Sequence, residues 1–162
     1  MYIRPQNITK WALVGWVGLC LLAGLLGSLA TSSKIGTWYA TLMKPWGNPP
    51  PWLFGPVWTT LYVLMGVAAW LIWKDDGEAG RRSALKLFLI QLSLNAMWSF
   101  VFFGLERPGA AFVNIVILWA LLLATTFAFR RISHLAGWLL VPYLAWVSYA
   151  SYLNGGIWWL NT

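Results

Sequence analysis

Long uncharged apolar stretches alternate with short polar ones along the chain. The first, residues 11–30, is 20 residues without a charged side chain, long enough to cross the roughly 30 Å hydrocarbon layer of a bilayer as a helix. Strands of a membrane barrel would instead be about ten residues long and alternate in polarity. The pattern therefore predicts an all-α integral membrane protein with five transmembrane helices. The predicted helices cover about residues 11–30, 52–73, 87–104, 109–129 and 135–153.

The composition agrees with a lipid environment. Of the 162 residues, 60% are hydrophobic and only 9% are charged, which is more apolar than a soluble domain of this length can bury. Residues 1–162 are expected to form one membrane domain. The first stretch could be a signal peptide, because Ser28-Leu29-Ala30 resembles a cleavage site. Its apolar part is longer than the usual 7–15 residues, so we expect a helix that remains in the protein.

The net charge of +7 reflects 11 Lys and Arg residues dispersed over short loops. A nucleic-acid partner is not expected, because such a partner requires basic residues gathered on one face. Eight of the 11, Arg4 among them, precede the first predicted helix or lie in loops on the same side of the membrane. The other three are Lys34, Lys44 and Arg107. The positive-inside rule predicts a cytoplasmic N-terminus, with the loop after the first helix and the C-terminus on the opposite side.

Groups that could carry acid–base or metal chemistry are few. The only acids are Asp75, Asp76, Glu78 and Glu106, all in predicted loops, and the only histidine is His134. The first three acids could form a metal or acid–base site, but a solvated turn between helices is favoured. The histidine has no ligand-type neighbour at metal-binding spacing. We therefore expect no catalytic residues, no metal site and no required cofactor.

The predicted spans contain no charged residue, which disfavours a proton- or ion-coupled transporter. They contain neutral polar side chains instead. Such groups need hydrogen-bond partners in hydrocarbon and usually find them on a neighbouring helix. The residues concerned are Gln91, Asn95, Asn114, Thr125, Thr126 and Asn154.

Residues 38–58, WYATLMKPWGNPPPWLFGPVW, contain four Trp and five Pro. Asn48 is predicted to cap the second long helix, with proline in its first turn. Pro45 is expected to end any helix that starts near Trp38. The segment is predicted to be a short, stiff lid on the mouth of the bundle. An ordinary belt of aromatic residues at the membrane interface is the alternative.

Helical spacing brings aromatic and amide residues into register on three predicted helices. A small alanine among large rings would leave room for a ligand. Flat aromatic walls with a few neutral hydrogen-bonding groups suit a flat, largely apolar molecule, and both sterols and tetrapyrroles fit that description. The aligned sets are Trp58 and Tyr62; Gln91, Asn95 and Trp98; and Tyr143, Trp146, Ala150 and Asn154. From these sets, the residues predicted to bind a ligand are Trp58, Tyr62, Asn95, Trp98, Trp146 and Ala150.

Four segments resemble the tryptophan-rich sensory protein and translocator protein family (TspO/MBR), also called the peripheral benzodiazepine receptor family. In chain order they are WYATLMKPWGNPPPWLFGPVWTTLYVLMG, QLSLNAMWSFVFFG, ATTFAF and VPYLAWVSYASYLN. The resemblance implies a five-helix membrane protein, often a homodimer. It also implies binding of porphyrins, haem-like tetrapyrroles, sterols or benzodiazepine-type ligands beneath the first loop.

By position, the resemblance implies that Asn95 donates a hydrogen bond to a ligand carbonyl or carboxylate and that the Trp rings stack on the ligand. The animal members' sterol motif is incomplete here, because Gly155 and Trp159 stand where that motif has Tyr and Arg. Tetrapyrrole is therefore favoured over sterol as the ligand. The ligand-lining residues implied by the resemblance are Trp38, Tyr39, Trp58, Asn95, Trp98, Trp146 and Ala150.

Three functions remain open from the sequence. The leading one is a receptor or transporter-like porphyrin binder involved in tetrapyrrole handling or stress signalling, with Lys34 and Lys44 meeting the propionates. Because His134 is expected on the far side, metal-free protoporphyrin IX should bind about as well as haem. The second is an enzyme that breaks down bound porphyrin in a light- or oxidant-dependent reaction. The third is a signalling or structural partner protein without ligand transport.

Dimerisation has one candidate surface. The pairs Ala23/Gly27 and Gly24/Ser28 give the first predicted helix a face of small residues. Such a face can join two subunits or pack helices within one subunit. The sequence does not choose between these two uses.

Overall fold

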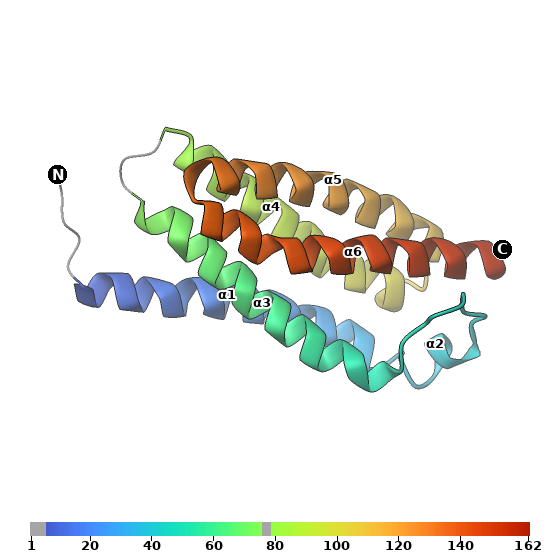
Figure 1. Cartoon of the computed structure of the whole chain (residues 1–162). Helices are drawn as coiled ribbons and strands as arrows, with labels where there is room; N and C mark the ends of the chain where they lie inside the picture. The colour runs from blue at the N-terminus through green and yellow to red at the C-terminus, as the bar shows by residue number, and fades with distance from the viewer. Residues whose placement is uncertain (1–5, 76–78) are drawn as a thin grey trace.

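The computed structural model describes residues 6–75 and 79–162, and its regular elements in these ranges are all helices (Figure 1). Arg4, Asp76 and Glu78 lie outside the described residues, so the predictions that involve them are not addressed. A short helix, α2 (Trp38–Thr41), lies between the first two long ones. The longer elements are α1 (Gln6–Ser32), α3 (Pro51–Lys74), α4 (Arg81–Ser99) with its π-helical continuation η1 (Phe100–Gly104), α5 (Pro108–Ile132) and α6 (His134–Leu160).

Four stretches of the described chain are long and apolar enough to cross a membrane as helices. They are Thr9–Ser32, Pro51–Lys74, Arg81–Gly104 and Pro108–Ile132. The fifth predicted span lies in α6, which is 27 residues long but does not meet the same hydropathy criterion. Its four Trp and three Tyr carry polar atoms that lower its hydropathy. An all-helical fold with several membrane-length helices is therefore observed, whereas the count of five spans stays a prediction.

The helices are longer than the apolar stretches that predicted them. The α4 helix begins at Arg81 rather than near residue 87, and α6 ends at Leu160 rather than near residue 153. Basic residues lie at the C-terminal ends of two helices: Lys74 is in the last turn of α3, and Arg130 is in the last turn of α5. Positive charge at a helix C-terminus is favourable because it offsets the helix dipole, and the uncharged core of each helix does not reveal these extra turns.

Figure 1 shows the lid with α2 and the C-terminus at one end of the bundle, and the start of α1 and the α5–α6 turn at the other. His134, the first residue of α6, therefore lies at the end away from the lid. Which end faces the cytoplasm stays a prediction.

The α1 helix lies at the edge of the bundle and packs on α3, α4 and η1. In its most apolar stretch 17% of the residues are buried, against 33–39% in the other three candidate spans. It crosses α3 closely, since a Cβ atom built on Gly66 would lie 2.5 Å from the Val17 Cα. The end of the bundle away from the lid is densely packed, with Phe88 and Phe129 stacked at 5.7 Å between ring centroids.

Candidate ligand-binding site

The lid is organised by its prolines. Pro50, not Asn48, precedes the first residue of α3, and Pro51 takes the first helical position, so the predicted asparagine cap was wrong. A capping oxygen accepts a hydrogen bond from the N–H of the second or third helical residue. If Asn48 were the cap, these residues would be Pro50 and Pro51, which have no N–H. Asn48 Oδ1 instead accepts a hydrogen bond from the Tyr39 hydroxyl at 2.8 Å. Burial raises the pKa of Tyr39, so this donor keeps its proton at neutral pH.

Side chains of α6 hold the lid in place. The hydroxyls of Tyr149 and Tyr152 donate to the backbone carbonyls of residues 47 and 46 respectively. Asn161 binds both polar groups of the Met43 backbone, accepting from its N–H at 3.0 Å and donating to its carbonyl at 2.9 Å. These four bonds satisfy lid backbone groups that have no secondary structure of their own to pair with.

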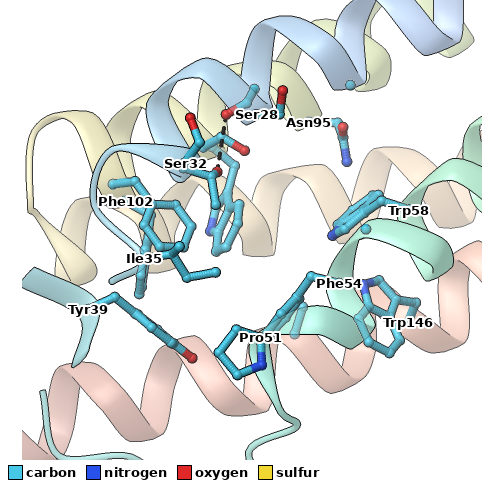
Figure 2. Close-up of a pocket in the computed structure, with 18 of the residues that line it drawn as sticks. Ser28, Ser32, Ile35, Tyr39, Pro51, Phe54, Trp58, Asn95, Phe102 and Trp146 are labelled. Atoms are coloured by element: carbon cyan, nitrogen blue, oxygen red, sulfur yellow. Dashed lines mark hydrogen bonds between the residues drawn. The ribbon is translucent and has the colours of Figure 1, made fainter. Parts of the chain in front are cut away.

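A cavity of about 470 Å³ lies beneath the lid, among α1, α3, the α4–η1 helix and α6 (Figure 2). Trp38 is not among its lining residues; this side chain packs behind the wall, 5.6 Å from Phe102 between ring centroids. A role for Trp38 in ligand binding stays a prediction. The other predicted site residues all line the cavity: Tyr39, Trp58, Tyr62, Asn95, Trp98, Trp146 and Ala150.

Stacked aromatic pairs form the cavity walls. Trp58 and Tyr62, one helical turn apart on α3, stack at 5.4 Å with an interplanar angle of 27°. Trp98 stacks on Phe102 at 5.1 Å and 24°. The register expected from helical spacing is therefore observed on α3. The ring pairs present flat apolar faces to the cavity.

The polar groups that remain unpaired at the cavity are donors. Asn95 Oδ1 accepts from the Tyr62 hydroxyl at 2.6 Å. The Asn95 side chain also hydrogen-bonds that of Tyr143. In residues 6–75 and 79–162, no acceptor pairs with the indole N–H of Trp58 or the hydroxyl of Ser99. Figure 2 shows the amide nitrogen of Asn95 pointing toward the side of the cavity where Trp58 lies. A ligand in this cavity would therefore be recognised through its acceptors.

Charged groups lie outside the cavity, since all of its described lining residues are uncharged. Lys34 pairs with Glu106 at 2.6 Å. The Lys44 ammonium lies 4.8 Å from the ring centroid of Tyr39 and donates to the Leu42 carbonyl at 3.0 Å. Neither lysine is positioned to meet a ligand carboxylate without first leaving its present partner. Among the residues with described placement, no three His, Cys, Asp or Glu side chains lie together.

Sequence reasoning missed the contribution of α1. Gly24 and Gly27 lie against the Tyr62 ring and the Ser99 hydroxyl, where a Cβ on Gly27 would come within 3.0 Å of the Ser99 oxygen. The face of small residues is therefore used within the subunit, and several of its members line the cavity. The spacing of glycine and serine in the sequence indicated a face of small residues on α1. It did not distinguish packing within the subunit from a contact between two subunits. Phe54 was also missed; it lines the cavity beside Trp146.

The sequence comparisons place this architecture among known proteins. The model of the TspO/MBR family matches residues 16–160. The chain belongs to the TspO/MBR family. Relatives in this family include the tryptophan-rich protein TspO of Chlorobaculum tepidum, 48% identical over 149 residues, covering 90% of this chain and 92% of that protein. The translocator protein of Bos taurus is 39% identical over 147 residues, covering 90% and 87%.

A third relative, the tryptophan-rich sensory protein of Cereibacter sphaeroides, is 38% identical over 145 residues, covering 89% of this chain and 88% of that protein. The resemblance predicted from the four motifs is thus confirmed. Together with its membrane-length helices, membership of this family identifies the chain as an integral membrane protein of the translocator and sensory type.

Proposed function

We propose that this protein is a membrane receptor or transporter-like protein that binds porphyrins and related tetrapyrroles in the cavity beneath the lid. The cavity supports this proposal most directly. Its volume of about 470 Å³ falls within the range of roughly 300–1,000 Å³ usual for small-molecule sites. The stacked pairs Trp58–Tyr62 and Trp98–Phe102 provide faces that suit a flat aromatic macrocycle.

The unpaired donors give the cavity its polarity. The Trp58 indole N–H can donate to ring nitrogens or to a carbonyl, and the Asn95 amide can do so in exchange for its bond to Tyr143. Because the described lining is uncharged, the ligand's carboxylates are expected at the rim of the cavity, where water and headgroups can solvate them. A sterol-like or benzodiazepine-type molecule with a carbonyl or hydroxyl acceptor uses the same groups.

The membrane arrangement belongs to the same proposal. Five spans, with α6 as the fifth, place the lid and the C-terminus on one side and the N-terminus on the cytoplasmic side. A homodimer is expected from the resemblance; its surface must include residues other than Gly24 and Gly27, which are occupied within the subunit.

Titration of protoporphyrin IX into the protein in lipid nanodiscs tests the proposal, with quenching of tryptophan fluorescence as the signal. Saturable quenching is expected for the wild type. Loss of one ligand hydrogen bond is worth about 0.5–1.5 kcal/mol, so Asn95→Ala and Trp58→Phe should each weaken binding about 2- to 12-fold. Asn114→Ala is the matched control, because Asn114 is a similarly buried amide (7% exposed against 4% for Asn95) that does not line the cavity.

Linear, unsaturable quenching that is the same in all four proteins would show partitioning into lipid and reject the proposal. Equal loss of affinity in Asn95→Ala and Asn114→Ala would also count against it, because a general loss of packing would then explain both. Haem provides a second comparison. The site offers no histidine, so metal-free porphyrin should bind about as well as haem.

A further inference from the structure

The cavity is open on one side of the bundle. Several residues line it and are also exposed on the outer surface: Ser28 and Ser32 on α1, and Gly55 and Thr59 on α3. In Figure 2 the two serines and the labelled α3 residues lie on opposite sides of the open space. A side chain that borders the cavity and the outer surface at once marks an opening. The opening here is a slit between the lid-side halves of α1 and α3.

The crossing of the two helices explains the slit. The helices touch at Gly66 and Val17, where a Cβ would come within 2.5 Å of backbone. One turn closer to the lid, the Tyr62 ring fills the space over Gly24. Beyond that point the helices have separated, since nothing lies within 4 Å of a Cβ built on Gly55. The slit thus begins at Tyr62 and widens toward the lid.

The floor of the cavity is closed. The hydrogen bond from Tyr62 to Asn95 spans α3 and α4. Beneath it, Met65, Gln91 and Tyr143 are all 0% exposed, and the Tyr143 hydroxyl donates to Gln91 at 3.0 Å. The cavity therefore ends inside the bundle and does not continue to the end that carries the α5–α6 turn.

The lid and the slit differ in how firmly they are closed. Opening the lid would break the four bonds from α6 to lid backbone groups. By contrast, no hydrogen bond joins α1 to α3 on the lid side of Gly66 in the parts of the chain that are described. The hydroxyls at the slit bond to their own helices: Ser28 to the Leu25 carbonyl at 2.7 Å and Thr59 to the Gly55 carbonyl at 2.9 Å. These edges can face acyl chains without an unpaired donor.

We propose that the slit between α1 and α3 is a lateral portal, through which flat apolar molecules dissolved in the lid-side leaflet enter and leave the cavity. The source of the ligand is thus the acyl-chain layer rather than the aqueous phase above the lid. Because the floor is closed, exchange takes place with one leaflet only. The identity of the ligand rests on the function proposed above, whereas the portal does not.

Access from lipid can be measured without any porphyrin. A bimane fluorophore on Ser99→Cys, in a Cys20→Ala background, would report from the cavity lining. Lipids brominated in the middle of their acyl chains should quench it strongly, and aqueous iodide should quench it weakly. The reverse pattern, or no quenching by brominated lipid, would overturn the portal. Quenching by brominated lipid combined with unsaturable porphyrin binding would leave the portal standing and reject only the proposed ligand.

Exchange rates provide the second test. In the Cys20→Ala background, Ser28→Cys and Thr59→Cys lie on opposite edges of the slit, and a flexible bis-maleimide would bridge them. With protoporphyrin IX as the probe, stopped-flow association and dissociation should both slow at least 10-fold, while the equilibrium constant changes less than about 3-fold. The Ser28→Cys protein treated with the same reagent is the control for modification alone.

The lid route predicts the opposite behaviour. Asn161→Ala loosens the lid without touching the cavity and should leave both rates within 2-fold of wild type. Unchanged rates after cross-linking, or rates accelerated 10-fold by Asn161→Ala, would overturn the proposal. If the double-cysteine protein does not fold, Thr59→Trp narrows the slit from one side and should slow exchange in the same direction, and unchanged rates in that variant would reject the portal.

Discussion

Replacement of Gly66 by alanine tests the close backbone contact between α3 and α1. A Cβ at this position would lie 2.5 Å from the Cα and 2.8 Å from the nitrogen of Val17. Both are backbone atoms, so no side chain can rotate away. To restore an ordinary contact of at least 3.4 Å, the helices must separate by roughly 1 Å, a gap that forfeits about a quarter to a half of the dispersion attraction at each contact.

The expected cost follows from overpacking, which typically destabilises by about 1–3 kcal/mol. A glycine-to-alanine change inside a helix also stabilises the folded state by up to about 1 kcal/mol, because alanine has the higher helix propensity. Gly18→Ala, in the middle of α1, gains the same helix propensity, and its Cβ would meet nothing within 4 Å. The difference between the two variants therefore isolates the steric cost.

Thermal unfolding followed by circular dichroism in one detergent gives the comparison. Gly66→Ala should unfold at a lower midpoint than Gly18→Ala by about 2–12 °C, since 1 kcal/mol corresponds to about 2–4 °C for a protein of this size. Midpoints that agree within 1 °C would refute the reasoning. The crossing of α1 and α3 would then be looser than the structure shows, and the explanation of the slit would fail with it.

Three further outcomes are expected. Tyr62→Phe keeps the stacked ring but leaves a buried amide oxygen without its donor, so the free energy of unfolding should fall by about 1–3 kcal/mol, measured by denaturant titration. Asn161→Ala removes both bonds to the Met43 backbone, so hydrogen exchange should accelerate in residues 42–50 and stay unchanged in the long helices. The Lys34–Glu106 pair is 37% exposed on each side, so a double-mutant cycle should give a coupling below about 1 kcal/mol.

The long helices could be predicted because uncharged runs of about 20 residues have few alternatives in a bilayer. Their ends could not, because Arg81 and Leu160 belong to turns that extend past the apolar runs. The α6 helix shows the converse difficulty, because a helix that contains four Trp and three Tyr has a lower mean hydropathy than one built from Leu and Val. Its helical form was predicted, while its status as a span requires a measurement.

Part of the cavity could be predicted from spacing alone. Trp58 and Tyr62, four residues apart, do share a helix face and stack. The contribution of α1 could not be predicted, because a stripe containing Gly24 and Ser28 gives the same signal whether a partner helix or a cavity lies against it. Asn48 shows a local failure: its residue type suits a helix cap, but the prolines that follow remove the N–H groups that a cap would bind.

The tryptophans of the site divide by whether their ring N–H is occupied. The Trp98 N–H donates to Asn154 at 2.9 Å, and the Asn154 amide in turn donates to the Pro108 carbonyl at 2.8 Å, so this ring is held between α4, α6 and the start of α5. The Trp58 N–H has no acceptor among the described residues. Trp98 therefore serves as a fixed wall that shapes the cavity, whereas Trp58 retains a donor that only a ligand or water can satisfy. Specific recognition should accordingly depend on the Trp58 N–H, whereas the walls provide the area for stacking.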